Sequence, residues 1–361
     1  MLLLPCVLAM IAVPAAAADI DDVLYQQEEA AGISELEDAA AEAGGIARYG
    51  ETLDQGLGKL LKAGSSEAGG VIRKAVRSGV LLMAIVLLCG LGENLLESTG
   101  KRSIPVVSLA GTLAVAAVAM TDVGSMLGLG KETIQNITSF SNVLLPSVAA
   151  ITAATGAVTG AAVRQMAAAL FSDLLVNLIN SLLIPILYAY LAVSIACAAI
   201  GNDGLKQLGA MLKWLATTVL TAVMLAFVAY LSLSGVVAGS ADAMSIKAAK
   251  FAISGAIPVI GGILADASET ILASAGVLRG SVGVFGAITV LGLCLTPVMR
   301  LSVHYLMYKL VAALSATVST GRLSTLIDQI GKAFGLMLGM TGACGLLLLI
   351  ALVSSITAVS V

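Results

Sequence analysis

Long apolar runs, several of them about as long as a bilayer is thick, constrain this chain more than any other feature of its sequence. Hydrophobic residues make up 59% of the 361 residues and charged residues only 11%, and the mean hydropathy is +1.02. Because about 25% of the residues of a soluble domain are charged, this composition predicts a multi-span membrane protein. No strand-like alternation competes with helix in these runs, so we expect an all-α fold. The runs predict seven spans, near residues 78–92, 103–121, 143–163, 174–200, 214–237, 280–299 and 333–357.

The segment 247–270 departs from a plain span. Its uncharged run, 251–265, is shorter than the 20 or so apolar residues that a crossing helix needs, and Pro258 removes a backbone donor inside it. One interpretation is a short, kinked core helix. The other is a broken or re-entrant segment beside a pore or docking surface, since broken helices at membrane depth need protein or water around them. The candidate structural or pore motif comprises Lys247, Lys250, Pro258, Gly261, Gly262, Asp266 and Glu269.

The predicted fold class is therefore all-α, a polytopic membrane protein with about seven or eight transmembrane helices and one short broken or re-entrant segment. If all eight segments cross, nine cations fall in the inner loops and four in the outer loops, as the positive-inside rule prefers. If 251–265 does not cross, the last two loops change sides and the bias disappears.

The N-terminal region reads as a targeting segment followed by a short exported segment. Residues 1–18 are apolar and end in an alanine run before Asp19, which predicts a cleaved signal peptide. The first Lys or Arg is Arg48, so the usual basic start is missing, and the alternative is a short first membrane anchor. Residues 19–77 are predicted to be acidic and partly helical, with a hinge at 64–66, and to pack on the membrane domain, 78–361, or on a partner.

Polar residues inside the apolar runs are the next candidates for function. Asp173, Asn177 and Asn180 are spaced i, i+4 and i+7, on one face of a helix, and form a candidate intramembrane polar face. Polar groups at membrane depth should face protein or water, so the face is either a ladder of interhelical hydrogen bonds, which we favour, or a pore lining. His304 and Tyr308 lie one turn apart in the amphipathic stretch 301–330, where a structural role is preferred to a proton relay.

Chemistry-bearing motifs are missing from the sequence. The segment 128–132, Gly-Leu-Gly-Lys-Glu, lacks the spacing of a phosphate-binding loop, and we find no metalloprotease or serine-hydrolase motif. The five cysteines are scattered without a Cys-x-x-Cys pair, so neither a disulfide framework nor a metal site is predicted. No basic patch with interleaved aromatics suggests nucleic acid. We therefore expect no enzyme activity and no cofactor.

Three segments of the chain resemble segments of a known protein family. KFAISGAIPVIGGILADASET, at 250–270, is followed by Gly-Val-Phe-Gly at 283–286 and Leu-Thr-Pro at 295–297, and NLINSLLIPILYAYLAVS occupies 177–194. Together with an export signal and a short soluble segment, these passages resemble the stage III sporulation protein AE family over roughly residues 70 to 361.

The resemblance implies a function in endospore development. Family members belong to a complex made in the mother cell, in the membrane around the engulfed forespore. The implied partners are the lipid bilayer, other stage III sporulation membrane proteins and a forespore-side protein, which together form a channel or secretion-like apparatus. The alternative is a self-sufficient secondary transporter for an unidentified small solute, with its site at the 258–262 break and the Asp173 face.

Overall fold

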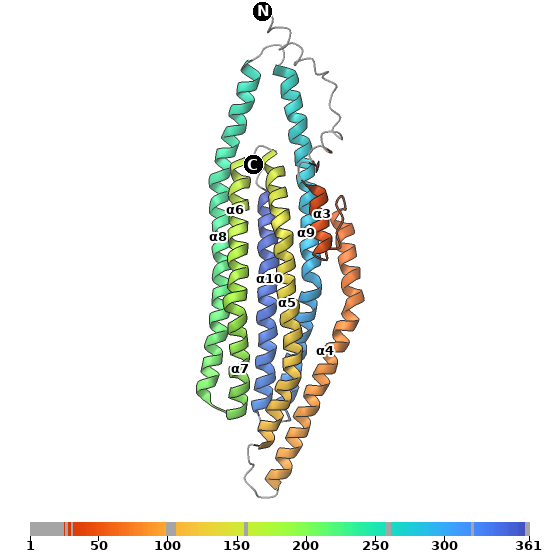
Figure 1. Cartoon of the computed structure of the whole chain (residues 1–361), viewed down its shortest axis with the longest axis vertical. Helices are drawn as coiled ribbons and strands as arrows, with labels where there is room; N and C mark the ends of the chain where they lie inside the picture. The colour runs from red at the N-terminus through yellow and green to blue at the C-terminus, as the bar shows by residue number, and fades with distance from the viewer. Residues whose placement is uncertain are drawn as a thin grey trace, which may run out of the picture.

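The computed structural model describes residues 25, 28, 29, 32–98, 106–154, 158–256, 261–318 and 321–357. Within these ranges every regular element is a helix, which confirms the all-α class, and the helices form an elongated bundle (Figure 1). The predicted signal peptide, 1–18, lies outside the described residues. The helices are α3 (Ile33–Glu42), α4 (Leu53–Ser98), α5 (Val106–Ala154), α6 (Val158–Leu178), α7 (Ile184–Ile200), α8 (Asp203–Ala256), α9 (Gly261–Ser315) and α10 (Gly321–Thr357).

Six stretches of the described chain are long and apolar enough to cross a membrane. They are Leu53–Glu93, Val106–Thr152, Gln165–Ile200, Asp203–Leu231, Gly280–Ser315 and Gly321–Ser354. The predicted span 103–121 lies almost entirely on α5, whereas 143–163 straddles the end of α5 and the start of α6. The seven predicted spans therefore correspond to six helical stretches in the described residues.

Helix α5 shows why the spans predicted from the sequence differ from the helices of the structure. Lys131 and Glu132 suggested a loop between two spans, but both are exposed side chains in the middle of one continuous helix. The stretch Val106–Thr152 has 47 residues and is about 70 Å long, more than twice the roughly 30 Å of a bilayer's hydrocarbon core. A helix of that length must extend into water or protein, and its polar residues there do not interrupt it.

Helix α4 is also continuous, and this corrects the predicted hinge at 64–66. The hydroxyls of Ser65 and Ser66 donate to the carbonyls of Lys62 and Ala63 at 2.9 and 2.8 Å, so both serines are satisfied within the helix. The expected domain boundary after residue 77 falls inside α4. The amphipathic stretch 301–330 is likewise not one element, because α9 ends at Ser315 and α10 begins at Gly321.

One π turn, Ile179–Leu183, joins α6 to α7 into a single rod. Pro185 follows this turn and has no backbone N–H to donate to the preceding turn of the helix. A wider π turn accommodates such a residue without ending the helix, as Figure 1 shows for the continuous path of α6 and α7.

The long helices alternate in direction, so their connections gather at two ends. The turns at Gly201–Asn202 and 316–318 lie together, because the Arg322 guanidinium sits against Gly201, and we call this the turn end. Helices α8 and α9 extend past the rest of the bundle at the opposite end (Figure 1). The C-terminal end of α10 also points away from the turn end.

Close packing of α9 on α10 uses glycine. A Cβ added to Gly331 would lie 3.2 Å from Cβ of Tyr308, and one added to Gly335 would lie 3.2 Å from the Tyr305 ring. The spacing of these two glycines is the small-residue pattern that lets helices approach closely in membranes. The α9–α10 contact is the most extensive in the described bundle.

The N-terminal segment packs on the side of the bundle. The Asn136 amide on α5 donates to the carbonyl oxygen of Ala43 at 3.3 Å, and the rings of Tyr49 and Phe285 meet edge to face at 6.3 Å. Burial raises the pKa of the Tyr49 hydroxyl, and the nearby charge of Glu28 raises it further. This contact agrees with the expectation that the segment packs on the membrane domain.

Candidate functional site

A buried carboxylate joins three helices in the middle of the bundle. The Tyr308 hydroxyl of α9 donates to Oδ2 of Asp122 on α5 at 2.9 Å, and the Ser78 hydroxyl of α4 donates to Oδ1 at 3.2 Å. Tyr308 is 0% exposed and Asp122 8%. A buried carboxylate is costly unless hydrogen bonds compensate for lost water, and here each oxygen accepts one. We call Ser78, Asp122 and Tyr308 the three-helix cluster.

Aromatic rings enclose this cluster on the α10 side. The ring of Phe334 packs edge to face on Tyr308 at 4.9 Å and lies 5.7 Å from His304. Nδ1 of His304 lies 2.8 Å from the carbonyl oxygen of Arg300, which assigns the ring proton to Nδ1. Nε2 of His304 is buried and has no hydrogen-bond partner among the described residues. The histidine is thus a buried member of the α9–α10 interface, the role preferred from the sequence.

A second acidic residue links α4 to α9 farther from the turn end. Glu67 accepts hydrogen bonds from the Thr296 hydroxyl at 2.6 Å and from Nε and Nη2 of Arg300 at 3.1 and 2.5 Å. Arg300 keeps 41% of its side chain exposed and Glu67 31%, so water weakens this ion pair. Thr296 and Arg300 lie on either side of Pro297, which lacks a backbone donor inside α9. The contacts with Glu67 therefore attach α4 to α9 at the point where α9 lacks one backbone hydrogen bond.

A third carboxylate, Asp328, lies on α10 close to the turn end. It pairs with Lys309 of α9 at 2.5 Å and with Lys332, one turn along α10, at 2.7 Å. All three side chains are about one third exposed. The ammonium group of Lys309 also lies 5.9 Å from the centre of the Tyr305 ring.

Together these groups act as interhelical ties. Asp122, Glu67 and Asp328 each bind a donor on another helix, so each carboxylate is compensated inside the chain. Their donors are hydroxyl, guanidinium and ammonium groups, an arrangement that fixes helix positions and offers no nucleophile activated by a base. Among the described residues, no group of three or more His, Cys, Asp or Glu side chains could hold a metal ion.

The predicted polar face lies elsewhere. Asp173 and Asn177 are exposed on the outer surface of α6, and Asn180 is half-buried in the π turn. In the part of the chain that the structure describes, Asp173 and Asn177 form no hydrogen bond with another helix. None of the three residues belongs to the three-helix cluster, and their common face stays a prediction.

The predicted central motif lies mostly outside what the structure describes. Pro258 is not among the described residues, nor are the side chains of Lys247, Lys250, Asp266 and Glu269. The described backbone ends α8 at Ala256 and begins α9 at Gly261, with Gly262 next in the helix.

Sequence reasoning missed Asp122, the residue that joins three helices. It directly follows the predicted span 103–121 and was not among the candidate residues. The available signal was its spacing from buried Val115, Ala119 and Val123, which continues one helical face beyond residue 121.

Comparison with known proteins identifies relatives along most of the chain. The family model for stage III sporulation protein AE matches residues 54–359. The stage III sporulation protein AE of Bacillus subtilis (strain 168) is 26% identical over 227 residues, which cover 63% of this chain and 57% of that relative. The aligned stretch thus spans little more than half of the relative's length. No solved structure matches the chain.

Proposed function

Because the chain belongs to the stage III sporulation protein AE family, we propose that it is an integral membrane component of the channel or secretion-like complex that connects mother cell and forespore during endospore development. One observation carries this proposal. The family match at 54–359 covers the same part of the chain as the six membrane-capable helices, which run from Leu53 to Ser354. The membrane-embedded part is therefore the part that the family shares.

Exposed charge on the long helices supports a role inside a larger assembly. Arg73, Lys74 and Arg77 are exposed on α4, and Asp173 is exposed on α6. Ionisable groups on membrane-capable helices are expensive in lipid and usually face protein or water. We propose that these faces meet other stage III sporulation membrane proteins and a forespore-side partner, in the mother-cell-derived membrane around the forespore.

We propose that the turn end faces the mother-cell cytoplasm. Among the described residues, five cations on three helices lie near that end and four lie near the opposite end, and the positive-inside rule prefers the end with more cations. Six crossings then place the C-terminus on the same side as the segment that precedes α4. Reporter fusions after Val361 and before Leu53 should therefore give the same side, and opposite sides would exclude an even number of crossings. Among the described residues, the cations on helices near the turn end are Lys206, Lys213, Lys309, Arg322 and Lys332, against Arg164, Lys247, Lys250 and Arg279 near the opposite end.

A count of seven or eight spans stays part of the proposal. It requires crossings in addition to the six described, and the segments available are 1–18 and the 251–265 run. We propose that the latter is broken around Pro258 and serves as a docking or pore segment, because Pro258 lacks a backbone donor and Gly261 and Gly262 weaken a helix just after it.

The transporter alternative predicts a polar solute site between helices. In the described bundle the interhelical carboxylates Asp122, Glu67 and Asp328 are already paired with groups of the chain itself. This pairing favours a scaffold within a complex over a solute-binding permease.

Deletion of the gene in the bacterium that encodes this chain tests the proposed function. We expect few heat-resistant spores, development that stops after engulfment, and normal vegetative growth. An intact copy expressed only in the mother cell should restore spore formation. Normal spore yield in the deletion strain would contradict a sporulation role, and a growth defect on one particular solute would favour the transporter.

A further inference from the structure

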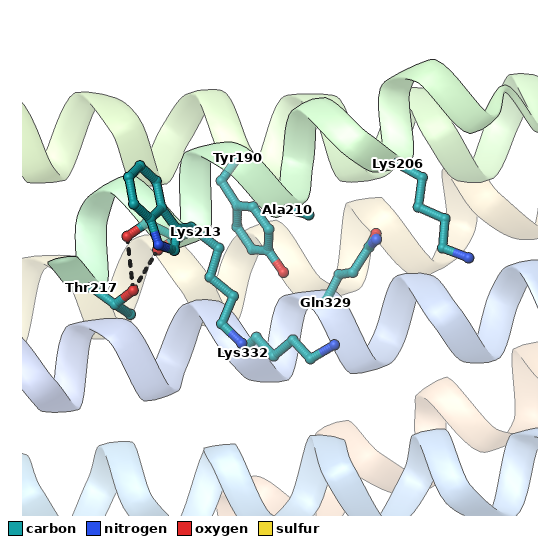
Figure 2. Close-up of a pocket in the computed structure, with 8 residues that line it drawn as sticks. Tyr190, Lys206, Ala210, Lys213, Thr217, Gln329 and Lys332 are labelled. Carbon is teal, nitrogen blue, oxygen red and sulfur yellow. Dashed lines mark hydrogen bonds between the residues drawn. The ribbon is translucent and has the colours of Figure 1, made fainter.

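A lysine-rich cavity lies between α7, α8 and α10, close to the turn end (Figure 2). Its volume is about 430 Å³, within the usual range of small-ligand sites. Lys206 lies at one end and Thr217 at the other, so along α8 the cavity covers about 16 Å. In Figure 2, Tyr190 points from α7 toward α10, and Lys213 extends toward Lys332 across the cavity.

The cavity carries excess positive charge. Lys206, Lys213 and Lys332 all line it. Lys332 is paired with Asp328 at 2.7 Å, whereas Lys206 and Lys213 have no ion-pair partner in the described part of the chain. Like charges held in one cavity repel each other, and an anion bound among them removes that repulsion.

The polar groups that accompany the lysines suit a hydrogen-bonding anion. Gln329 lines the cavity from α10; its Oε1 can only accept hydrogen bonds, so toward an anion only its Nε2 amide group can contribute. Its amide group can donate hydrogen bonds into the cavity, as lysine ammonium groups can. Phosphate oxygens accept several such bonds at once.

The cavity also lies where apolar surface begins on two helices. On α8, Trp214 is 64% exposed, and the predicted span that begins there, 214–237, is apolar. On α10, Lys332 is followed directly by the predicted apolar span 333–357. Exposed tryptophan and lysine at the start of an apolar run are typical of the membrane–water interface. A ligand in this cavity can therefore keep apolar chains in the bilayer while its polar group lies among the lysines.

We propose that this cavity binds the phosphate group of an anionic phospholipid. Basic cavities between membrane helices on the cytoplasmic side are suited to anionic headgroups, and the exposed Trp214 ring offers contact to acyl chains. Free phosphate shares the headgroup chemistry but gains nothing from the adjoining apolar surface. The proposal uses the orientation given above but does not depend on the sporulation role.

The single tryptophan of the chain makes the site directly observable. Trp214 is the only tryptophan, so the fluorescence of the full-length protein reports on lipid next to the cavity. The protein is reconstituted in phosphatidylcholine vesicles that contain equal fractions of either brominated phosphatidylglycerol or brominated phosphatidylcholine. Because bromine quenches tryptophan at short range, preferential quenching by the anionic lipid measures its enrichment at the site. We expect that enrichment in the wild type.

Substitutions of the cavity lysines test whether the preference for anionic lipid depends on the cavity. The double variant Lys206→Gln, Lys213→Gln should abolish most of the preference, because each lysine removed should lower the enrichment of the anionic lipid about fivefold. Lys206→Arg with Lys213→Arg should retain it, and so should Lys131→Gln, which removes an exposed lysine of α5 far from the cavity. Circular dichroism and gel filtration confirm that each variant is folded. Equal quenching by both lipids in the wild type, or a full preference in the double glutamine variant, would overturn the proposal.

Inorganic phosphate separates the two sources of the ligand. If excess phosphate leaves the preference unchanged, beyond the effect of sodium chloride at equal ionic strength, the headgroup assignment is supported. If phosphate alone shifts Trp214 emission in pure phosphatidylcholine vesicles and removes the preference, the site takes free phosphate and the lipid assignment is overturned.

Discussion

The Tyr308 hydroxyl of α9 donates a hydrogen bond to Oδ2 of Asp122 on α5 at 2.9 Å, and the two residues are separated by 186 positions in the chain. The bond ties the first half of the bundle to the second. Ser78 of α4 binds the other oxygen of the same carboxylate, so one aspartate holds three helices in register. Loss of either donor leaves a buried carboxylate short of one partner.

Tyr308→Phe should lower the free energy of unfolding by about 1–3 kcal/mol, because it leaves a buried oxygen of Asp122 without its partner while the ring contact with Phe334 is kept. Denaturation in mixed detergent micelles measures the change. Tyr188→Phe is the matched control, because that tyrosine of α7 is 49% exposed. Equal effects of the two substitutions would show that the Asp122 bond contributes nothing.

Gly90 of α4 lies against the α9–α10 turn, where an added Cβ would be 2.9 Å from the carbonyl oxygen of Val318. Gly90→Ala should therefore destabilise the bundle by about 1–3 kcal/mol, since a backbone atom must move. Gly70→Ala, in the same helix with nothing within 4 Å, should be neutral or stabilising by up to about 1 kcal/mol. The same micelle denaturation compares them, and indistinguishable variants would contradict the position of this turn.

Cysteines at positions 173 and 177 should react with a small hydrophilic maleimide in intact sporulating cells. The background strain carries replacements of Cys89, Cys197, Cys294 and Cys344. Leu174→Cys is the control, because Leu174 is 48% exposed on a neighbouring, apolar face of α6. Faster labelling at 173 and 177 than at 174 is expected if the polar face meets water. No labelling at either position would contradict contact with water and would favour the ladder of interhelical hydrogen bonds.

The sequence predicted those features that depend on residues close together in the chain, such as apolar runs and residues one helical turn apart. Uninterrupted apolar runs located α7 and the later part of α10, the helices that the structure places there. His304 was expected to be structural, and its side chain is buried, as is that of Tyr308 one turn away.

Long-range relationships could not be predicted in the same way. The contact of Asp122 with Tyr308 joins distant helices, and no periodicity in the sequence connects them. Exposed Lys131 and Glu132 hid the continuity of α5, because a polar break in an apolar run has the same pattern in a loop and in a helix that leaves the bilayer. The lysines of the α8 cavity are ordinary charges in the sequence until α10 brings Lys332 beside them.

Replacement of Pro258, Gly261 and Gly262 by leucine should abolish spore formation while membrane insertion stays intact. Leucine restores the backbone donor at 258 and favours a straight helix through the region that the proposed break occupies. Heat-resistant spore counts and membrane fractionation measure the two effects separately. A fully active triple variant would show that the break is not needed.

Co-purification from sporulating cells tests the central proposal most directly. The full-length protein, tagged after Val361 and expressed only in the mother cell, is cross-linked after engulfment and isolated from detergent-solubilised membranes. We predict that other stage III sporulation membrane proteins and a protein made in the forespore are recovered with it, and that an identically tagged, unrelated mother-cell membrane protein recovers neither. Recovery of the chain alone, from cells that form normal numbers of spores without it, would contradict a role in a complex between the two cells.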